Sequence, residues 1–366
     1  MARHRPGLAS LLFVGGASLL IIPALVAGTL YTGALQRSAE AGVVENLRFR
    51  GELSANQIAR RLDRLWRQVE ALSRLLDPAK VGDARERIDL LSDLDDRYSW
   101  IGIAEVGGRV LASTKGMLEG VSVAERPWFR RGLEGPAAID VHEAVLLAKL
   151  LPATGETRNF IDFAAPLKGA NGNVTGVVGA HLDWRWMVDT LTSLQSPGID
   201  ILLISRDRVV LFGPPDLVDR PLDVGSAIAA SRAPLSARDE RWPDGKDYFT
   251  LVVPAIAYSD LPSFGWSLLM RQSVDDALRP TRELVRTFWV MLGTGAFASL
   301  VLLFLGARWV ATPLRRLAGS ADALVSSGEP QVPRQETRYD EVNRLSAALV
   351  RLQFRAFPGR PEDGGK

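Results

Sequence analysis

The sequence predicts an α+β fold held between two membrane-spanning helices. Three observations support this prediction: two long uncharged apolar runs, one long helical heptad pattern, and two successive sets of short apolar or alternating segments. In chain order we expect a long helix, two antiparallel-sheet modules, a helix that returns to the membrane, and a helical hairpin beyond it. The 366 residues are 47% hydrophobic and 23% charged, a composition typical of a folded protein.

Two uncharged runs are long enough to cross a bilayer, whose hydrocarbon core takes about 20 residues. The first run, residues 8–35, is too long for the apolar part of a secretory signal peptide, which has about 7–15 residues. The second predicted span covers residues 287–308. Arginines in the tail 1–7 and after the second span favour the cytoplasm for both ends of the chain.

Residues 36–286, between the spans, form the predicted extracytoplasmic domain. Its first helix has a heptad seam with 4-3-4-3-4 spacing and ends at Pro78. The seam consists of Ile58, Leu62, Leu65, Val69, Leu72 and Leu76. It either packs along its own domain or pairs with a second copy in a coiled coil. Short strand segments separated by turn sequences such as EVGGR and GANGN then predict a distal module at about 79–195 and a proximal module at about 196–272.

Residues 309–354, after the second span, contain two amphipathic helical segments. Their apolar residues are spaced 3-4-3 in each segment: Leu314, Leu317, Ala321 and Leu324, then Val342, Leu345, Leu349 and Leu352. Two such helices cannot bury their seams alone, so we expect a homodimer in which they form a four-helix bundle. Only the tail 355–366 follows, which leaves no room for a catalytic domain or a methyl-accepting hairpin.

These segments resemble known receptor parts. Pro313, the Leu314/Leu317 seam and the acidic pair Asp340–Glu341 closely resemble a HAMP linker, the relay that follows the last span of bacterial transmembrane receptors. The extracytoplasmic part resembles a double Cache sensor domain in its long first helix, in ERPWFRRGLEG (125–135) and in AAPLKGANGNVTGVVGAHLD (164–183). The resemblance implies two PAS-like modules, a periplasmic ligand pocket in the distal one, and a place in the bacterial inner membrane.

In that family, an arginine–aromatic motif and an acidic residue ending a late strand line the distal pocket. Arg126 offers a planar fork of donors suited to a carboxylate, and Trp128 offers an indole N–H and an apolar face. Pro127 restricts Arg126 to extended geometry. Alternatively, Trp128 is core and Arg126 pairs with a structural carboxylate. Asp183 is placed to cap the helix that begins at Trp184, either in that role alone or while it also accepts a ligand ammonium.

The segment IDVHEA places Asp140 and His142 on one face of a strand by alternation, so we expect both to be polar contacts in the pocket. His142 and His181 could also hold a metal ion together with Glu143 or Asp183. No closely spaced ligand pair supports that alternative, and we expect neither a metal nor a cofactor.

The sequence leaves the ligand open. Val121 stands where the amino-acid-binding branch of the family has a tyrosine, so an amino acid, an organic acid and an amine all stay possible. Lys149 and Arg158 add nearby positive charge, which favours an anion. The net charge of +2 gives no reason to expect a nucleic-acid partner, and the 0 cysteines exclude disulfides and cysteine metal sites.

We find no G-x-S-x-G, H-E-x-x-H or P-loop motif. We therefore expect a sensor that is not an enzyme and that relays ligand binding through the HAMP segment to an output on a partner protein, such as a kinase, a cyclase or a chemotaxis protein. The alternative is a truncated or split diguanylate cyclase or sensor histidine kinase whose catalytic domain is missing from the chain.

Overall fold

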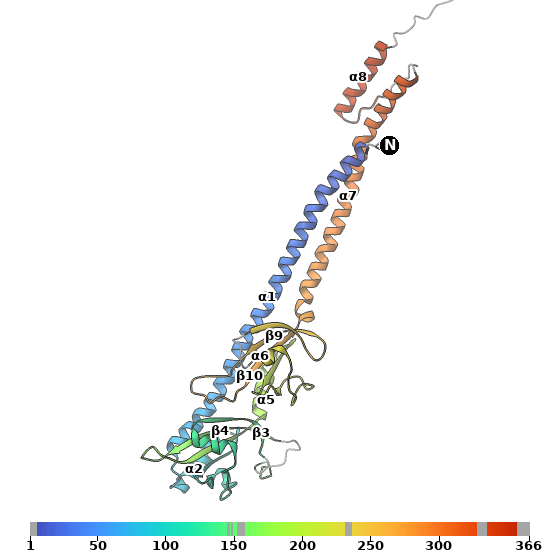
Figure 1. Ribbon diagram of the computed structural model, residues 1–366. Helices are drawn as coiled ribbons and strands as arrows, with labels where there is room; N and C mark the ends of the chain where they lie inside the picture. Colours follow the sequence, from blue (N-terminus) through green and yellow to red (C-terminus); the bar gives the residue numbers. More distant parts are fainter. Residues whose placement is uncertain are drawn as a thin grey trace, which may run out of the picture. The chain divides into compact units, whose positions relative to one another are not determined.

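The computed structural model describes residues 6–144, 147, 149–151, 158–230, 236–327 and 335–356. The chain forms two compact units, one from residues 38–279 and one from residues 1–37 together with 280–366. Helices α1 (Leu8–Leu75) and α7 (Val274–Ser327) each contribute to both units (Figure 1).

Both long helices contain a stretch apolar enough to cross a membrane, with mean hydropathy of 2.3 in α1 and 2.1 in α7. Within their unit the two helices contact one another through aromatic rings. The centroids of Phe13 and Phe304 are 5.9 Å apart, and those of Tyr31 and Phe288 are 5.5 Å apart. Gly28 lies against the Trp289 ring, as expected where small residues let membrane helices approach closely.

The unit 38–279 contains two five-stranded antiparallel sheets. The first has the order β2-β1-β5-β4-β3 and the second the order β7-β6-β10-β9-β8. When β6 to β10 are counted as strands one to five, the two orders are the same, so the second sheet repeats the topology of the first. The strands of the first sheet are β1 (Tyr98–Glu105), β2 (Val110–Ser113), β3 (Ala137–Glu143), β4 (Asn159–Lys168) and β5 (Val174–Asp183). Those of the second are β6 (Ile199–Ile204), β7 (Val210–Phe212), β8 (Ser236–Arg241), β9 (Asp247–Val253) and β10 (Ser267–Ser273).

The second half of α1 packs along both sheets. All six residues of its predicted heptad seam are at most 6% exposed and belong to one core shared with strands of both sheets. Among the two alternatives for the seam, the structure therefore shows packing along its own domain. The opposite faces of the sheets carry separate small cores.

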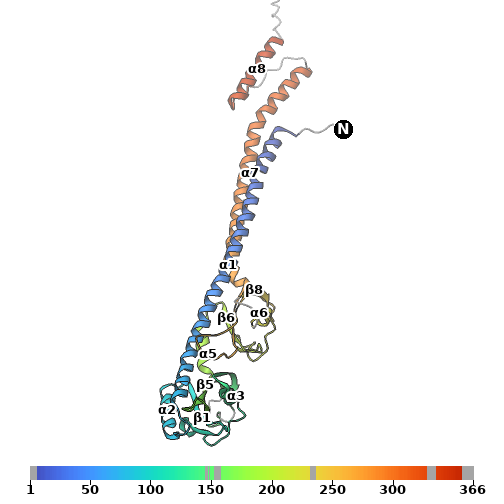
Figure 2. The ribbon, with the colours of Figure 1, turned by 60° about the vertical axis from the view of Figure 1, so that its left-hand side comes forward.

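Short helices complete the two modules. Figure 2 shows α2 and α3 on opposite sides of strands β1 and β5. The helices are α2 (Val81–Leu94), α3 (Pro127–Glu134), α5 (Arg185–Leu194), α6 (Gly225–Ala229) and α8 (Asp340–Ala356), with a 3-10 turn at Thr114–Gly116. The observed architecture confirms the predicted α+β class, with its long first helix and two antiparallel sheets.

The end of α7 and helix α8 form the predicted hairpin, but only part of its apolar seam is buried. Leu317 and Val342 are buried, whereas Leu345 is 46% and Leu352 is 62% exposed. Glu336, in the segment before α8, is buried and receives a 3.0 Å hydrogen bond from Arg316. Residues 328–334 and the Leu324 side chain of the predicted seam lie outside the described part.

Candidate functional site

A cavity of about 70 Å³ opens on the face of the first sheet that does not carry α1. Its walls come from strands β1, β3 and β5, from two residues after β3, from the start of α3, and from the loop between β2 and α3. They comprise Trp100, Leu118, Val121, Val123, Arg126, Pro127, Trp128, His142, Glu143, Ala144, Leu147 and His181.

Two indole rings form much of the apolar wall. Trp100 of β1 and Trp128 of α3 are both buried, and their centroids are 5.8 Å apart. They fit because Gly102 and Gly179 are cross-strand partners in β1 and β5. A Cβ at Gly102 would collide with the Trp100 ring, and one at Gly179 would collide with the Trp128 ring. Glycine inside a strand thus permits the close approach of an aromatic face.

Arg126 and Trp128 are brought to the same cavity by the start of α3. Pro127 occupies the first turn of the helix, and Arg126 before it is extended, with φ −78° and ψ 135°, as predicted. Trp128 is 3% exposed, so it is a core residue and a wall of the cavity at once. Phe129 is buried beside it and serves packing. Within the described part of the chain, no carboxylate pairs with the exposed Arg126 guanidinium.

His142 lines the cavity, but Asp140 does not. The register between β3 and β4 shifts between Ile139 and His142, and such a bulge breaks the alternation that places residues i and i+2 on one face. The Asp140 carboxylate instead accepts a 2.6 Å hydrogen bond from the indole N–H of Trp266. Burial raises the pKa of Asp140, and the hydrogen bond from Trp266 offsets part of that rise.

Asp183 is also not part of the cavity wall. Its carboxylate accepts hydrogen bonds from the Arg185 side chain and, at 2.9 Å, from the Arg185 backbone N–H at the start of α5. Burial acts to raise the pKa of Asp183, but these bonds and the charges of Arg185 and Arg158 outweigh it and leave the pKa lowered. The N-cap position of α5 is Trp184, so Asp183 does not occupy the predicted cap position but satisfies the first backbone N–H of the helix from the residue before it.

His181, which the sequence placed in the pocket region as a candidate metal ligand, lines the cavity and contacts Asp162, which the sequence had not singled out. They are cross-strand partners on β5 and β4, and His181 Nδ1 contacts Asp162 Oδ1. His142 Nε2 lies 3.3 Å from Asp162 Oδ2. Asp162 is only 1% exposed, and a carboxylate in the middle of the apolar run NFIDFAAPL was the signal that could have found it, because acidic residues are rarely fully buried without partners.

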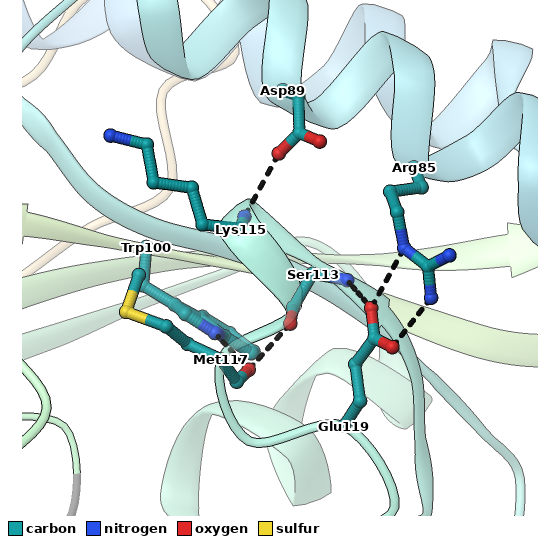
Figure 3. A network of polar contacts seen from close by, with 7 residues as sticks. All are labelled: Arg85, Asp89, Trp100, Ser113, Lys115, Met117 and Glu119. Carbon is teal, nitrogen blue, oxygen red and sulfur yellow. Dashed lines mark hydrogen bonds and ion pairs between the residues drawn. The ribbon is translucent and has the colours of Figure 1, made fainter.

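A polar network fixes the loop that carries Leu118 against α2 (Figure 3). Glu119 accepts a bidentate pair of hydrogen bonds from Arg85 and a further one from the Ser113 backbone N–H. The Met117 carbonyl accepts a 3.0 Å hydrogen bond from the Trp100 indole N–H. The same network therefore holds one cavity wall and orients the ring of Trp100.

Comparison with known proteins supports the fold. No family model matches the chain. The periplasmic sensory domain of the Campylobacter jejuni chemoreceptor Tlp1 is 13% identical, with 66% of this chain and 99% of that domain covered and a TM-score of 0.51. The ligand-binding domain of the Pseudomonas fluorescens chemoreceptor CtaA, in complex with L-isoleucine, is 22% identical. The match covers 67% of this chain and 98% of that domain, with a TM-score of 0.49. The ligand-binding domain of the Pseudomonas aeruginosa chemoreceptor PctC, in complex with GABA, is 20% identical. The match covers 63% of this chain and 99% of that domain, with a TM-score of 0.47. The likeness to the Tlp1 domain confirms the predicted double Cache fold.

Proposed function

We propose that the protein is an inner-membrane receptor, and not an enzyme, that senses a small periplasmic carboxylate in the cavity of its first sheet. The observation that carries this proposal is the position of Arg126. This residue lines a cavity walled by Trp100 and Trp128, and its guanidinium has no ion-pair partner among the described residues. A guanidinium at an apolar, concave site is a bidentate anchor for a carboxylate. The two apolar stretches of α1 and α7 and the sensory-domain fold support the membrane-receptor context.

The ligand class follows from the size and charge of the cavity. Its volume of about 70 Å³ is small, so a small acid fits better than a ligand with a long side chain. Val121 supplies a hydrophobic contact and no hydroxyl for an ammonium group. We therefore propose a small organic acid as the ligand. Amino acids and amines are tested beside it, and preferred binding of either class would change the proposed ligand.

The experiment measures binding to the full-length protein in detergent by calorimetry, against organic acids, amino acids and amines. We expect a carboxylate to bind the wild type and to bind Arg126→Ala about 10-fold or more weakly, because charged hydrogen bonds contribute about 1.5–3 kcal/mol. Arg131→Ala, on the same helix and exposed, is the matched control. Equal affinity in Arg126→Ala and in the control would contradict the proposal.

The hydrogen bond between Asp140 and Trp266 gives the route by which binding reaches the membrane helix. His142 of the cavity wall and Asp140 lie two residues apart on β3. Trp266 directly precedes β10, and β10 leads without a loop into α7. A ligand that moves β3 therefore moves β10 and the start of α7, and shifts of about 1–2 Å suffice for such switches.

Beyond the membrane we propose that the segment 309–354 acts as a HAMP relay in a homodimer and passes the shift to a cytoplasmic output. Leu345 and Leu352 support this proposal, because an apolar seam left exposed in one chain is suited to the same seam of a second copy.

A further inference from the structure

We propose that His142, Asp162 and His181 bind a divalent transition-metal ion, with Zn²⁺ as the reference probe. This inference goes beyond the proposed carboxylate sensing, because it uses other side chains and stands whether or not Arg126 binds an anion. Within the described residues, these three form a group in which one ligand atom from each lies within 4.8 Å of the others.

The fold brings the three ligands together from three adjacent strands. His142 comes from β3, Asp162 from β4 and His181 from β5, in a sheet whose order places β4 between the other two. Asp162 and His181 are direct cross-strand partners. The bulge in β3 turns His142 toward Asp162 while it turns Asp140 away. Each ligand therefore sits on a strand and not on a loop.

The hydrogen bonds of His142 leave two acceptor atoms facing one another. His142 Nδ1 lies 3.0 Å from the backbone carbonyl of Asp140, which can only accept, so Nδ1 carries the hydrogen. In the neutral imidazole Nε2 is then an acceptor, and it faces Asp162 Oδ2, another acceptor, at 3.3 Å. That carboxylate oxygen is buried and has no hydrogen-bond partner among the described residues. Two acceptors in this position need a proton or a metal ion between them.

A metal ion supplies positive charge there with suitable geometry. Two ligand atoms of a tetrahedral zinc site, each about 2.0–2.1 Å from the ion, lie about 3.3 Å apart, which matches the distance from His142 Nε2 to Asp162 Oδ2. The carbonyl of Asp140 on Nδ1 is the kind of outer partner that orients a metal-binding histidine. Two imidazoles and one carboxylate suit Zn²⁺ and neighbouring divalent metals, and do not suit Ca²⁺ or Mg²⁺, which prefer oxygen.

Three protein ligands leave one coordination position for exchange. Because His142 and His181 both line the cavity, a water or a carboxylate from that side can complete the site. The metal site and Arg126 would then face the same small volume.

The test uses full-length protein in detergent, purified without a histidine tag, stripped with chelator and titrated with Zn²⁺. Co²⁺ serves as a spectroscopic probe whose visible bands report coordination by nitrogen and oxygen. We expect one Zn²⁺ per chain and a loss of affinity of at least about 100-fold in His142→Ala and His181→Ala, more than outer-partner changes cost. His142 is the better variant, because its side chain is 33% exposed and its removal does not empty the core. His4→Ala is the matched control, since the chain has 3 histidines and this is the third.

If the stripped wild type takes up no Zn²⁺, or if His142→Ala binds as tightly as His4→Ala, the inference is overturned, and a shared proton is then the cation of the group. Asp162→Asn, checked for an unchanged melting curve, should lose the Co²⁺ bands, and retained bands in it would also count against the site. Arg126→Ala should keep Zn²⁺ binding. Normal zinc binding without any carboxylate binding would contradict the proposed function but would support the metal site.

Discussion

The Asp140 carboxylate of the first sheet accepts a 2.6 Å hydrogen bond from the indole N–H of Trp266, which directly precedes the last strand of the second sheet. Trp266 stacks on Phe264, with centroids 4.2 Å apart, and its ring also contacts Trp184. One partly buried hydrogen bond, whose indole packs against two other aromatic rings, thus joins the two modules next to the strand that leads into α7.

Asp140→Asn should change how stability depends on pH. Burial raises the folded-state pKa of Asp140, so the native chain binds more protons than the unfolded chain between about pH 3.9 and that raised value. Its stabilising contribution is therefore present below the unfolded pKa and is lost as pH rises through this window. The asparagine variant keeps an acceptor for Trp266 without the charge.

We expect the melting temperature of Asp140→Asn, relative to the wild type, to rise between pH 4 and pH 7. Asp140→Ala, the control, leaves the Trp266 N–H without its acceptor and should lose about 1–3 kcal/mol at either pH. Parallel pH profiles for the asparagine variant and the wild type would refute this account.

Gly179→Ala should damage the cavity directly. Its new Cβ would lie 2.5 Å from the Trp128 ring, so the indole must move, and overpacking of this kind costs about 1–3 kcal/mol. Thermal melts and ligand titrations measure both effects. Gly135→Ala is the control, because a Cβ there meets no atom of the described residues within 4 Å. If both variants behave alike, the close fit of Trp128 does not shape the site.

Asp183→Ala should weaken the start of α5 and leave ligand binding unchanged, since the Asp183 carboxylate accepts the Arg185 backbone N–H and does not line the cavity. We expect a loss of about 1 kcal/mol in the free energy of unfolding at neutral pH, measured by denaturant titration. Because the folded pKa of Asp183 is lowered, this contribution is present above the unfolded pKa of about 3.9 and disappears as pH falls through the folded value. Asp189→Ala, exposed on the same helix, is the control. A large loss of ligand affinity in Asp183→Ala would show that this residue takes part in ligand binding after all.

The membrane topology can be tested with single cysteines, because the chain has 0 of its own. Asp216→Cys lies on the exposed surface between β7 and α6, and Ala347→Cys is exposed on α8. A membrane-impermeant maleimide should label the first in bacteria with an opened outer membrane, and the second only after the inner membrane is broken. Labelling of both in intact inner membranes would exclude the proposed orientation.

The proposed dimer predicts a cross-link along the uncovered seam of α8. Leu352 is 62% exposed in one chain, so Leu352→Cys should form an intermolecular disulfide under mild oxidation in native membranes. Asn343→Cys, on another face of the same helix, should do so far less. Equal cross-linking at both positions, judged on non-reducing gels, would speak against a specific helix pair.

Local patterns were sufficient for much of this structure. Uncharged length predicted the two apolar helices, and the heptad spacing predicted the six seam residues, because both depend only on neighbours along the chain. Pro127 predicted the extended backbone of Arg126 for the same reason. The position of Arg126 and Trp128 at one cavity came from the resemblance to the receptor family.

Only the tertiary structure decided which polar residues meet. Alternation placed Asp140 beside His142, but the register shift in β3 sends Asp140 to Trp266 and leaves His142 at the cavity. The pairing of Asp162 with His181 is set by the register of β4 against β5, which no pattern within either strand contains. Sequence by itself determined the elements and their order, because those are local. Strand register joins segments distant along the chain, so the folded sheets alone determined the contents of the site.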